Sequence, residues 1–412
     1  MIQSILVARM LGAEAFGILA TIITFTSVVN KFASFRMGEL VIKYVGHYTE
    51  TGDQPRAAAL FKAAALAEIL ASVVAFGLIW VLSPLGARYL AKDIHLASWF
   101  TVYGLIVLAN LIAESSTGLL QIYDRFRRLA IVNVAQSAFS LVLIGLVSFT
   151  GGGLLEVLLA YIGGKMLGAL TLTGVALVEA SSRWGPRWWQ APISLLRPQA
   201  RELAHFAVST NLSASLSLVN KDAEPLWISF FRGPLETGYY KLALTLVNLV
   251  QMPVAPLPQA TYPELSRGVA RQDWDAVRDI LRQGSLLAGG YTLAAALVLF
   301  LVGRPLISLV YTPEFLPAYP ALLILLAGFL VANTFYWNRT ALLALGKPDF
   351  PTRVNLILAI AKLIGILLLV PRFGYLANAA LLAGSYVIGV SVCAWKARSI
   401  LSARRWAADW PG

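Results

Sequence analysis

The chain has 412 residues, of which 58% are hydrophobic and only 13% charged, and it carries a formal net charge of +12 with a mean hydropathy of +0.71. Because a soluble globular domain carries about 25% charged residues, this composition excludes that class and indicates a membrane protein. The single cysteine, Cys393, excludes a disulfide framework and a thiolate metal centre.

A series of apolar runs follows along the chain, separated by charged or Gly- and Pro-rich turns. Most of these runs exceed the ~18 residues that mark a membrane-spanning helix. The predicted spans are 15–45, 57–82, 96–120, 129–149, 154–179, 203–231, 238–262, 284–311, 318–344, 353–370 and 374–396. Runs of this length exclude a membrane β-barrel, whose strands alternate in hydrophobicity over about 10 residues. We therefore predict an all-α polytopic membrane protein.

Two distant segments repeat one short pattern. Residues 12–20 read GAEAFGILA and residues 233–243 read GPLETGYYKLA, so both place two glycines five positions apart ahead of an apolar run. An offset of 221 residues, or within two of it, also relates Pro84 to Pro305, Gly153 to Gly374, Asn110 to Asn333, and Asn133 to Asn355. A nearly constant offset across four helices predicts two homologous six-helix bundles.

The offset also predicts how the chain is divided. We expect an N-terminal lobe at 1–180, a cytoplasmic interfacial linker at 181–202, a C-terminal lobe at 203–396 and a cytoplasmic tail at 397–412. The counterpart of the span 203–231 would begin before Met1, so the first helix is expected to be truncated. A misassigned start or a truncated version would explain this, and a longer reading frame should add about 20 mostly apolar residues in front.

Lys and Arg are distributed unevenly over the predicted loops. Most of them fall on one side of the membrane, and the loops of the other side hold only Arg9, Arg88, Lys92, Arg232, Arg304 and Arg372. The positive-inside rule then places the basic loops and both termini in the cytoplasm. The linker mixes three tryptophans with arginines, a composition that suits the headgroup layer of the membrane. The same mix could stack on nucleic acid, but beside so many spans we expect membrane lipids and no nucleic acid as partners.

Several charged residues fall within the predicted spans, where a charge costs about 2.5–3.5 kcal/mol at the bilayer centre. The basic ones are Lys31, Arg36, Lys165, Lys221, Lys241, Arg339 and Lys362, and the main acidic ones are Glu39, Glu114, Asp222 and Glu224. Two pairs have helical spacing and can form local ion pairs, namely Lys221 with Glu224 and Arg36 with Glu39. Lys241 lies near the start of its span, from which it can extend outward to the interface.

Three basic residues are more difficult to explain as local pairs. Lys165 has no acidic neighbour at helical spacing and lies beside Gly164 and Gly168, which allow a second helix to approach closely. Lys362 lies in the middle of its span, and Arg339 lies among asparagines and a tryptophan. A cavity with excess positive charge favours an anionic passenger such as a phosphate or a carboxylate.

The candidate site therefore has two groups of residues. The candidates for binding an anionic headgroup are Lys165, Lys362, Arg339, Lys31, Arg36 and Lys221. The candidates for an ion pair or for coupling to an ion are Glu224, Asp222 and Glu39.

The sequence offers no catalytic constellation. The three histidines, His47, His95 and His205, lack the spacing of metal ligands. There is no phosphate-binding loop, no nucleophile elbow and no tight carboxylate cluster in an extramembrane segment. We predict a protein that is not an enzyme and that needs no cofactor or metal.

The stretch ILVARMLGAEAFGILATIITF, followed by GELVIKYVGHY, resembles the polysaccharide-export flippases of the multidrug/oligosaccharidyl-lipid/polysaccharide exporter superfamily, which typically open with ARxLGPxxFG. The segment FFRGPLETGYYKLALTL at 230–246 is similar to the second repeat of that family. The resemblance implies two six-helix lobes around a central cavity that opens alternately to each side.

The resemblance also implies an activity. Such flippases move an undecaprenyl-pyrophosphate-linked oligosaccharide repeat unit from the cytoplasmic to the outer leaflet of the bacterial inner membrane during polysaccharide biosynthesis. Basic cavity residues would then meet the pyrophosphate, in agreement with the excess of basic residues in the spans. We expect a monomer whose partners are the lipid-linked oligosaccharide and, beside it, a polysaccharide polymerase and glycosyltransferases.

Two other functional classes fit the same architecture. An H⁺- or Na⁺-coupled antiporter of the same superfamily could export a drug or metabolite, and for a cationic drug its cavity should carry net negative charge. A membrane assembly partner that transports nothing would have no pathway to explain the buried charges. The excess of basic residues favours the flippase over both alternatives.

Overall fold

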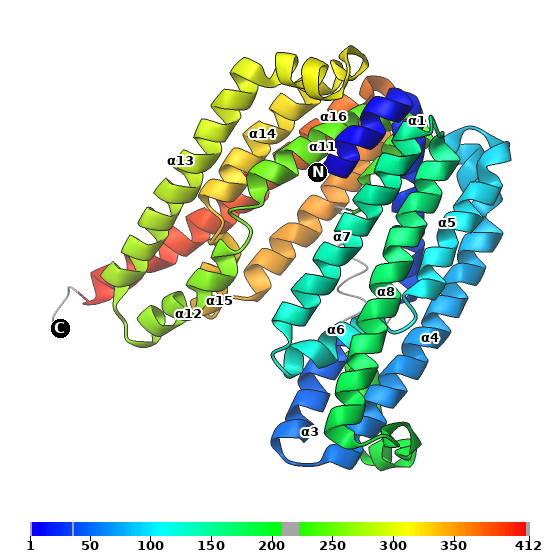
Figure 1. Ribbon diagram of the computed structural model, residues 1–412. Coiled ribbons are helices and arrows are strands. Elements are labelled where there is room, and N and C mark those ends of the chain that lie inside the picture. Colours follow the sequence, from blue (N-terminus) through cyan, green and yellow to red (C-terminus); the bar gives the residue numbers. More distant parts are fainter. Residues whose placement is uncertain (1, 35–36, 208–221, 409–412) are drawn as a thin grey trace. The chain divides into compact units, whose positions relative to one another are not determined.

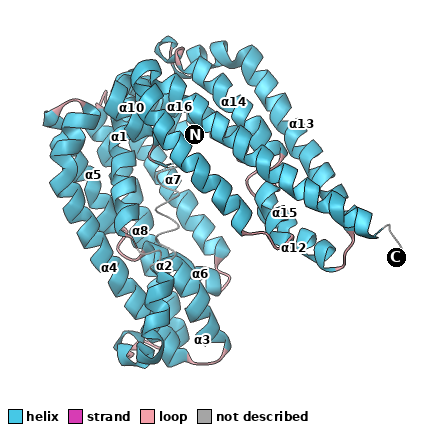
Figure 2. Ribbon diagram, turned by 180° about the vertical axis from the view of Figure 1, so that it is seen from behind, coloured by secondary structure: helices cyan, strands magenta, loops and turns pink. Residues whose placement is uncertain are grey.

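The computed structural model describes residues 2–34, 37–207 and 222–408, which form helices joined by short connections, without a strand among them (Figures 1 and 2). Eight of the described helices are long and apolar enough to cross a membrane. The predicted all-α polytopic fold is therefore confirmed. The chain forms two compact units: unit 1 comprises Met1–Leu11 and Ile18–Leu226, and unit 2 comprises Gly12–Gly17 and Trp227–Gly412.

Unit 1 is built on four long helices and their connections. Its helices are α1 (Ile2–Ala33, shared with unit 2 at Gly12–Gly17), α2 (Met37–Leu40), α3 (Gly46–Glu50), α4 (Gln54–Leu85), α5 (Ala97–Ala109), α6 (Ala113–Ile122), α7 (Phe126–Phe149) and α8 (Leu154–Trp184). Helix α8 packs against α5, α6 and α7, and α4 packs against α5 (Figure 1).

Unit 2 is centred on α14. Its helices are α10 (Glu224–Arg232, which begins in unit 1), α11 (Pro234–Gln251), α12 (Leu257–Ala270), α13 (Trp274–Leu306), α14 (Ala318–Thr334), α15 (Asn338–Ala344) and α16 (Asp349–Ala408). Helix α14 packs against α11, α13 and α16, and α15 packs against α12 and α16. The label α16 covers two consecutive helices that meet at Gly374, whose φ of 65° and ψ of −149° are not helical, in agreement with the two spans predicted at 353–370 and 374–396.

The same local structure recurs in α4 and α13. Each helix begins after an aspartate whose carboxylate accepts a hydrogen bond from the helix, Asp53 from Arg56 N at 3.2 Å and Asp273 from Ala276 N at 3.0 Å. Near its end each contains a proline at the paired positions 84 and 305. Proline cannot donate the usual intrahelical hydrogen bond, and a π-helical turn follows in both helices, at Gly86–Ala91 and Ile307–Tyr311.

The repeated glycines have a structural explanation. Gly12 and Gly233 share nearly the same backbone angles, φ 75° and ψ 178° against φ 94° and ψ 179°, in a region that L side chains rarely adopt. Gly17 and Gly238 pack against each other within unit 2, so closely that a Cβ on Gly17 would lie 1.8 Å from the carbonyl oxygen of Pro234. The pattern that recurs in the sequence is thus a helix-entry kink followed by a close helix contact.

Two spans that the sequence predicts as continuous are interrupted. The span 96–120 divides into α5 and α6 around residues 110–112, and the span 318–344 divides into α14 and α15 around residues 335–337. The breaks lie at paired positions of the two repeats, close to Asn110 and Asn333. Each break exposes the first backbone N–H groups of a new helix, which need hydrogen-bond acceptors inside the protein.

The segment between the two predicted lobes packs onto unit 1. Helix α8 extends to Trp184, and two short 3₁₀ turns follow at Trp188–Gln190 and Ile193–Gln199. The Phe61 ring of α4 lies 5.7 Å from the Trp184 ring and 5.3 Å from the Trp188 ring. These tryptophans join the hydrophobic core at the start of α4. Their location in the headgroup layer stays a prediction.

Candidate functional site

The predicted anion-binding residues occupy different environments. Lys362, in α16, is only 5% exposed, a rare position for an ammonium group inside an apolar helix. Lys165 in α8 and Arg339 in α15 are exposed, although both lie within candidate membrane spans. Because a charge is costly in hydrocarbon, an exposed cation in a membrane-spanning helix requires water or an anionic partner beside it.

Lys31 pairs with an acidic residue that the sequence also singles out. Its Nζ lies 2.6 Å from the carboxylate of Asp222, and both side chains are about half exposed, at 50% and 45%. This ion pair lies within unit 1 and joins the end of α1 to the residue two positions before α10. Lys31 and Asp222 thus form a local ion pair, one of the two roles proposed for Asp222.

The remaining candidates are only partly described. Arg36 and Lys221 lie outside the described residues, so the predicted pairs of Arg36 with Glu39 and of Lys221 with Glu224 stay predictions. Glu224 is buried, with 1% of its surface exposed, in the first turn of α10, whereas Glu39 is exposed in α2.

Sequence reasoning missed Glu68, which stabilises the break between α5 and α6. The side chain projects from α4 and is 7% exposed. Its carboxylate accepts hydrogen bonds from the backbone N–H of Glu114 at 2.8 Å, from the N–H of Ser115 at 3.0 Å and from the Ser115 hydroxyl at 2.7 Å. Glu68 therefore caps the N-terminus of α6 from a neighbouring helix, and a carboxylate is also favoured there by the helix dipole.

A polar cavity of about 210 Å³ lies next to this cap, within unit 1. Carboxylate, amide and hydroxyl groups line it, contributed by Asn30, Ser34, Glu68, Ser72, Asn110 and Glu114. Such oxygen-rich walls can hold water or a small hard cation. Among the described residues, no three His, Cys, Asp or Glu side chains come close enough together to hold a metal ion.

The corresponding break in unit 2 uses neutral groups. Trp337, only 1% exposed, donates from Nε1 to the Ser285 hydroxyl at 2.7 Å, and Asn333 donates from Nδ2 to the Thr292 hydroxyl at 3.2 Å. The residue 221 positions after Glu68 is Gly289, which cannot supply a carboxylate. The two units share their backbone design at this point but differ in charge.

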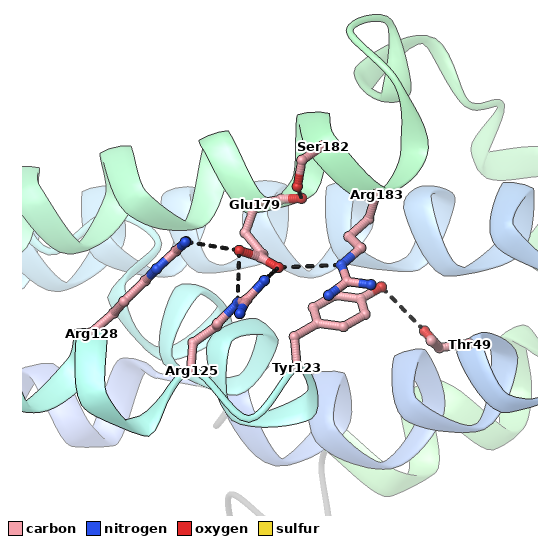
Figure 3. A network of polar contacts seen from close by, with 7 residues as sticks. All are labelled: Thr49, Tyr123, Arg125, Arg128, Glu179, Ser182 and Arg183. Carbon is pink, nitrogen blue, oxygen red and sulfur yellow. Dashed lines mark hydrogen bonds and ion pairs between the residues drawn. The ribbon is translucent and has the colours of Figure 1, made fainter.

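A second carboxylate missed by the sequence analysis anchors the end of α8 (Figure 3). Glu179 is 2% exposed, and its carboxylate lies 3.0 Å from Arg125, 2.9 Å from Arg128 and 3.2 Å from Arg183. Arg183 also stacks on the Tyr123 ring, 4.4 Å from its centroid. The hydrogen bonds from Arg125 to Glu179 raise the pKa of the Arg125 guanidinium. This cluster ties α7, α8 and the connection before α7 together.

The arrangement of helices matches transporters of known structure. An inward-facing multidrug resistance MATE family transporter of the MOP superfamily superposes with a TM-score of 0.80, at 13% identity, over 98% of this chain and 94% of that one. The inward closed conformation of the lipid II flippase MurJ gives a TM-score of 0.74, at 12% identity, over 100% of this chain and 90% of that one. The fold is therefore that of the MOP-superfamily transporters.

Comparison of the sequence with known proteins assigns the chain to a narrower group, a protein family. Residues 1–269 match the family described as polysaccharide biosynthesis protein, and the chain belongs to that family. It is also 22% identical over 305 residues to the inner membrane protein YghQ of Escherichia coli (strain K12), covering 74% of this chain and 85% of that protein. Together with the eight apolar helices, these findings identify a multi-pass membrane protein. The family resemblance drawn from the glycine motifs is confirmed.

Proposed function

We propose that the protein flips a lipid-linked oligosaccharide, carried on undecaprenyl pyrophosphate, from the cytoplasmic to the outer leaflet by alternating access. The observation that carries the proposal is the burial of Lys362 at 5% exposure within an apolar helix of a protein of the polysaccharide biosynthesis family. A buried intramembrane ammonium group is by default part of a substrate or ion pathway. A pyrophosphate is the anionic group that this cargo would bring to it.

The two buried carboxylates that the structure adds, Glu68 and Glu179, have partners of their own. Glu68 is satisfied by two backbone N–H groups and a hydroxyl, and Glu179 is satisfied by three arginines. Both carboxylates therefore bind groups of unit 1. Lys165, Arg339 and Lys362 lie in other parts of the helices, and they remain the best candidates to meet an anionic headgroup.

Two further features support transport of a lipid. The fold is shared with a protein whose name describes it as a lipid II flippase. Helices α11 and α12 are separated at residues 252–256, a stretch that contains Pro253 and Pro256, and interruptions of this kind in a membrane helix provide a point of bending. We infer that both termini face the cytoplasm and that a polysaccharide polymerase and glycosyltransferases act beside the protein.

A deletion strain tests the proposal. We expect the strain to accumulate lipid-linked repeat units and to lose surface polysaccharide, and we expect the wild-type gene to restore both. The variant Lys165→Ala/Lys362→Ala should fail to restore them at wild-type protein level. Arg88→Ala/Lys92→Ala removes two cations from the π-helical turn after α4 and the residue that follows it, and serves as the matched control that restores export. Unchanged surface polysaccharide with Lys165→Ala/Lys362→Ala would refute the cationic-pathway account.

A second candidate function is cation-coupled antiport, which the oxygen-lined cavity beside Glu68 favours. The two functions separate in the deletion strain. An antiporter for drugs or metabolites should change the resistance of the cells to toxic compounds without accumulation of lipid-linked oligosaccharide. Accumulation of that lipid without a change in resistance supports the flippase.

A further inference from the structure

Unit 2 contains a cavity of about 480 Å³ beside the break between α14 and α15, and the function proposed above assigns no role to it. It lies between the first turns of α13, the break between α14 and α15, and the last part of α16. Three guanidinium groups line it, from Arg278, Arg282 and Arg398, and no Asp or Glu occurs among the described residues of its wall. Its remaining wall is largely apolar and includes Leu281, Phe335 and Trp337. The cavity thus combines concentrated positive charge with a hydrocarbon-like surface.

The protein holds two of the arginines in place. Arg278 donates from Nη2 to the carbonyl oxygen of Leu401 at 2.9 Å, and its other terminal nitrogen lies 3.4 Å from the exposed Asp275 carboxylate. The Arg398 guanidinium lies over the rings of Phe335 and Trp337, 5.0 and 5.8 Å from their centroids. Guanidinium groups oriented in advance lose less entropy when they bind an oxyanion.

Arg282 is the most available of the three. It lies one helical turn after Arg278 and is exposed, and it makes no ion pair or hydrogen bond with the part of the chain that the structure describes. Its guanidinium presents a planar set of N–H donors that matches phosphate geometry. Three arginines at one cavity therefore provide more donors than the described groups of the protein use.

At the corresponding end of unit 1, a cluster of three arginines has a buried anion as its partner. There, three arginines converge on the buried carboxylate of Glu179 (Figure 3). The residue 221 positions after Glu179 is Ile400, in the last part of α16. The three arginines of the unit 2 cavity stand at other positions of the repeat, and no buried carboxylate like Glu179 lies among the described residues of the cavity wall.

The rim of the cavity indicates what kind of anionic ligand could bind to the three arginines. Leu286 lines the cavity and is 67% exposed, and Leu287 and Leu293 continue an exposed apolar surface along α13. Within the candidate membrane span Trp274–Tyr311, only 11% of an apolar stretch of 18 residues is buried. An exposed apolar helix face of this length suits contact with lipid chains. A ligand at this cavity can therefore place a phosphate among the arginines and a hydrocarbon chain along the leucines.

We propose that this cavity binds one anionic phospholipid of the surrounding leaflet. Its phosphate contacts Arg282 and Arg398, with Arg278 behind them, and one acyl chain lies against Leu286 and the aromatic wall. A free inorganic phosphate would leave the apolar wall uncovered, so the lipid is the better match. The site lies wholly within unit 2 and does not depend on the proposed flippase activity.

Native mass spectrometry of the purified full-length protein in detergent tests this site. Dioleoylphosphatidylglycerol is the probe, and dioleoylphosphatidylcholine is the zwitterionic comparison. We expect the wild type to retain one phosphatidylglycerol under conditions that strip phosphatidylcholine. Arg282→Gln/Arg398→Gln should weaken retention by at least about tenfold, since two charged hydrogen-bond donors to the phosphate are lost. Arg267→Gln/Arg271→Gln removes two exposed arginines of the neighbouring α12 region and should retain the lipid.

A second pair of variants keeps the arginines intact. Ser402→Glu places a carboxylate in the wall of the cavity, in imitation of Glu179, and should also abolish retention. Ser399→Glu adds the same charge one turn earlier, outside the cavity wall, and should retain the lipid. Equal retention by wild type, Arg282→Gln/Arg398→Gln and Ser402→Glu would overturn the proposal, as would equal loss in the control variants.

The transported lipid is the alternative occupant, and competition separates the two. Undecaprenyl diphosphate added at the same concentration should leave the bound phosphatidylglycerol in place. Displacement at a lower concentration than phosphatidylglycerol itself requires would assign the cavity to the transported lipid instead. Because binding is measured without any glycan or export, a failure of the flippase proposal does not affect this result.

Discussion

At the scale of single residues, Gly17 shows how strongly backbone packing restricts this chain. A Cβ at this position would lie 1.8 Å from the carbonyl oxygen of Pro234, 2.7 Å from its carbonyl carbon and 2.9 Å from the nitrogen of Gly238. All three neighbours are backbone atoms, which cannot move away by changing a rotamer. Gly77 in α4, by contrast, has no atom within 4 Å of its added Cβ.

We expect Gly17→Ala to destabilise the protein by at least about 3 kcal/mol, because overpacking against a backbone leaves no inexpensive relaxation. Gly77→Ala should be neutral or stabilising by up to about 1 kcal/mol, since alanine is the better helix former. Thermal unfolding in detergent, followed by size-exclusion chromatography, measures both. Equal melting temperatures for Gly17→Ala and Gly77→Ala would contradict the close contact.

The sequence predicts some residues of the site and misses others for a physical reason. A lysine in a long apolar run signals a buried charge, so Lys362 could be found from the pattern alone. Glu68 and Glu179 lie in similar runs, but apart from Arg183, four residues after Glu179, the partners described above are 46 to 54 residues away in the sequence. Which partners a buried charge has is a property of the tertiary structure, so the three arginines around Glu179 become apparent only in the structure.

At the scale of elements, the interruption between α5 and α6 depends on a side chain from α4. The residues around the break read ANLIAE, without the Gly or Pro that usually marks a helix end. The hydrophobic pattern therefore predicts a continuous span there. Glu68 supplies the acceptors that the N-terminus of α6 needs, so tertiary contacts outweigh the local pattern.

Glu68→Ala should destabilise the N-terminus of α6 at the break between α5 and α6. Removal of the carboxylate leaves the N–H groups of Glu114 and Ser115 without their acceptor, at a cost of about 2–4 kcal/mol. Hydrogen–deuterium exchange of peptides covering residues 110–118 should become faster, while peptides covering residues 333–340, at the break of unit 2, should not change. Glu68→Gln retains one acceptor oxygen and should be intermediate. Unaltered exchange at 110–118 in Glu68→Ala would contradict the capping role.

The repeated elements were the most predictable part of the fold. The constant offset of 221 residues identified the helix-entry glycines and the prolines near the ends of α4 and α13, and the structure gives these pairs the same local geometry. The pairing of Gly153 with Gly374 does not extend to the backbone, where φ is −97° and 65°. The offset of 221 residues identifies related positions, but the backbone conformation of a turn can differ between the two units.

At the scale of the whole molecule, the orientation in the membrane is the prediction that charge counting makes most directly. The basic loops should face the cytoplasm, and the loop after α4, with Lys92, should face outward. Single cysteines in a Cys393→Ser background test this, because Cys393 is buried and serine is close to it in size. In intact cells a membrane-impermeant maleimide should label Lys92→Cys and spare Lys347→Cys. The reverse labelling would invert the proposed direction of transport.

The two units share one backbone design but differ in where their charges are neutralised. Unit 1 buries two carboxylates that cap α6 and bind three arginines, whereas unit 2 uses neutral groups at the same break and leaves three arginines lining a cavity. A repeat pattern in the sequence cannot predict such differences, because it is built only from the positions that the two repeats share. They are the features that would allow two similar units to perform different tasks in one transporter.

The central claim is that the protein moves an oligosaccharide linked to undecaprenyl pyrophosphate across the membrane, and translocation by the purified protein in vesicles tests it most directly. The measured quantity is the rate at which a fluorescently labelled lipid of this class becomes accessible to a membrane-impermeant quencher. We predict a rate above that of protein-free vesicles, which falls to the protein-free value in Lys165→Ala/Lys362→Ala. A wild-type rate equal to that of protein-free vesicles, or an unchanged rate in the double variant, would contradict the account.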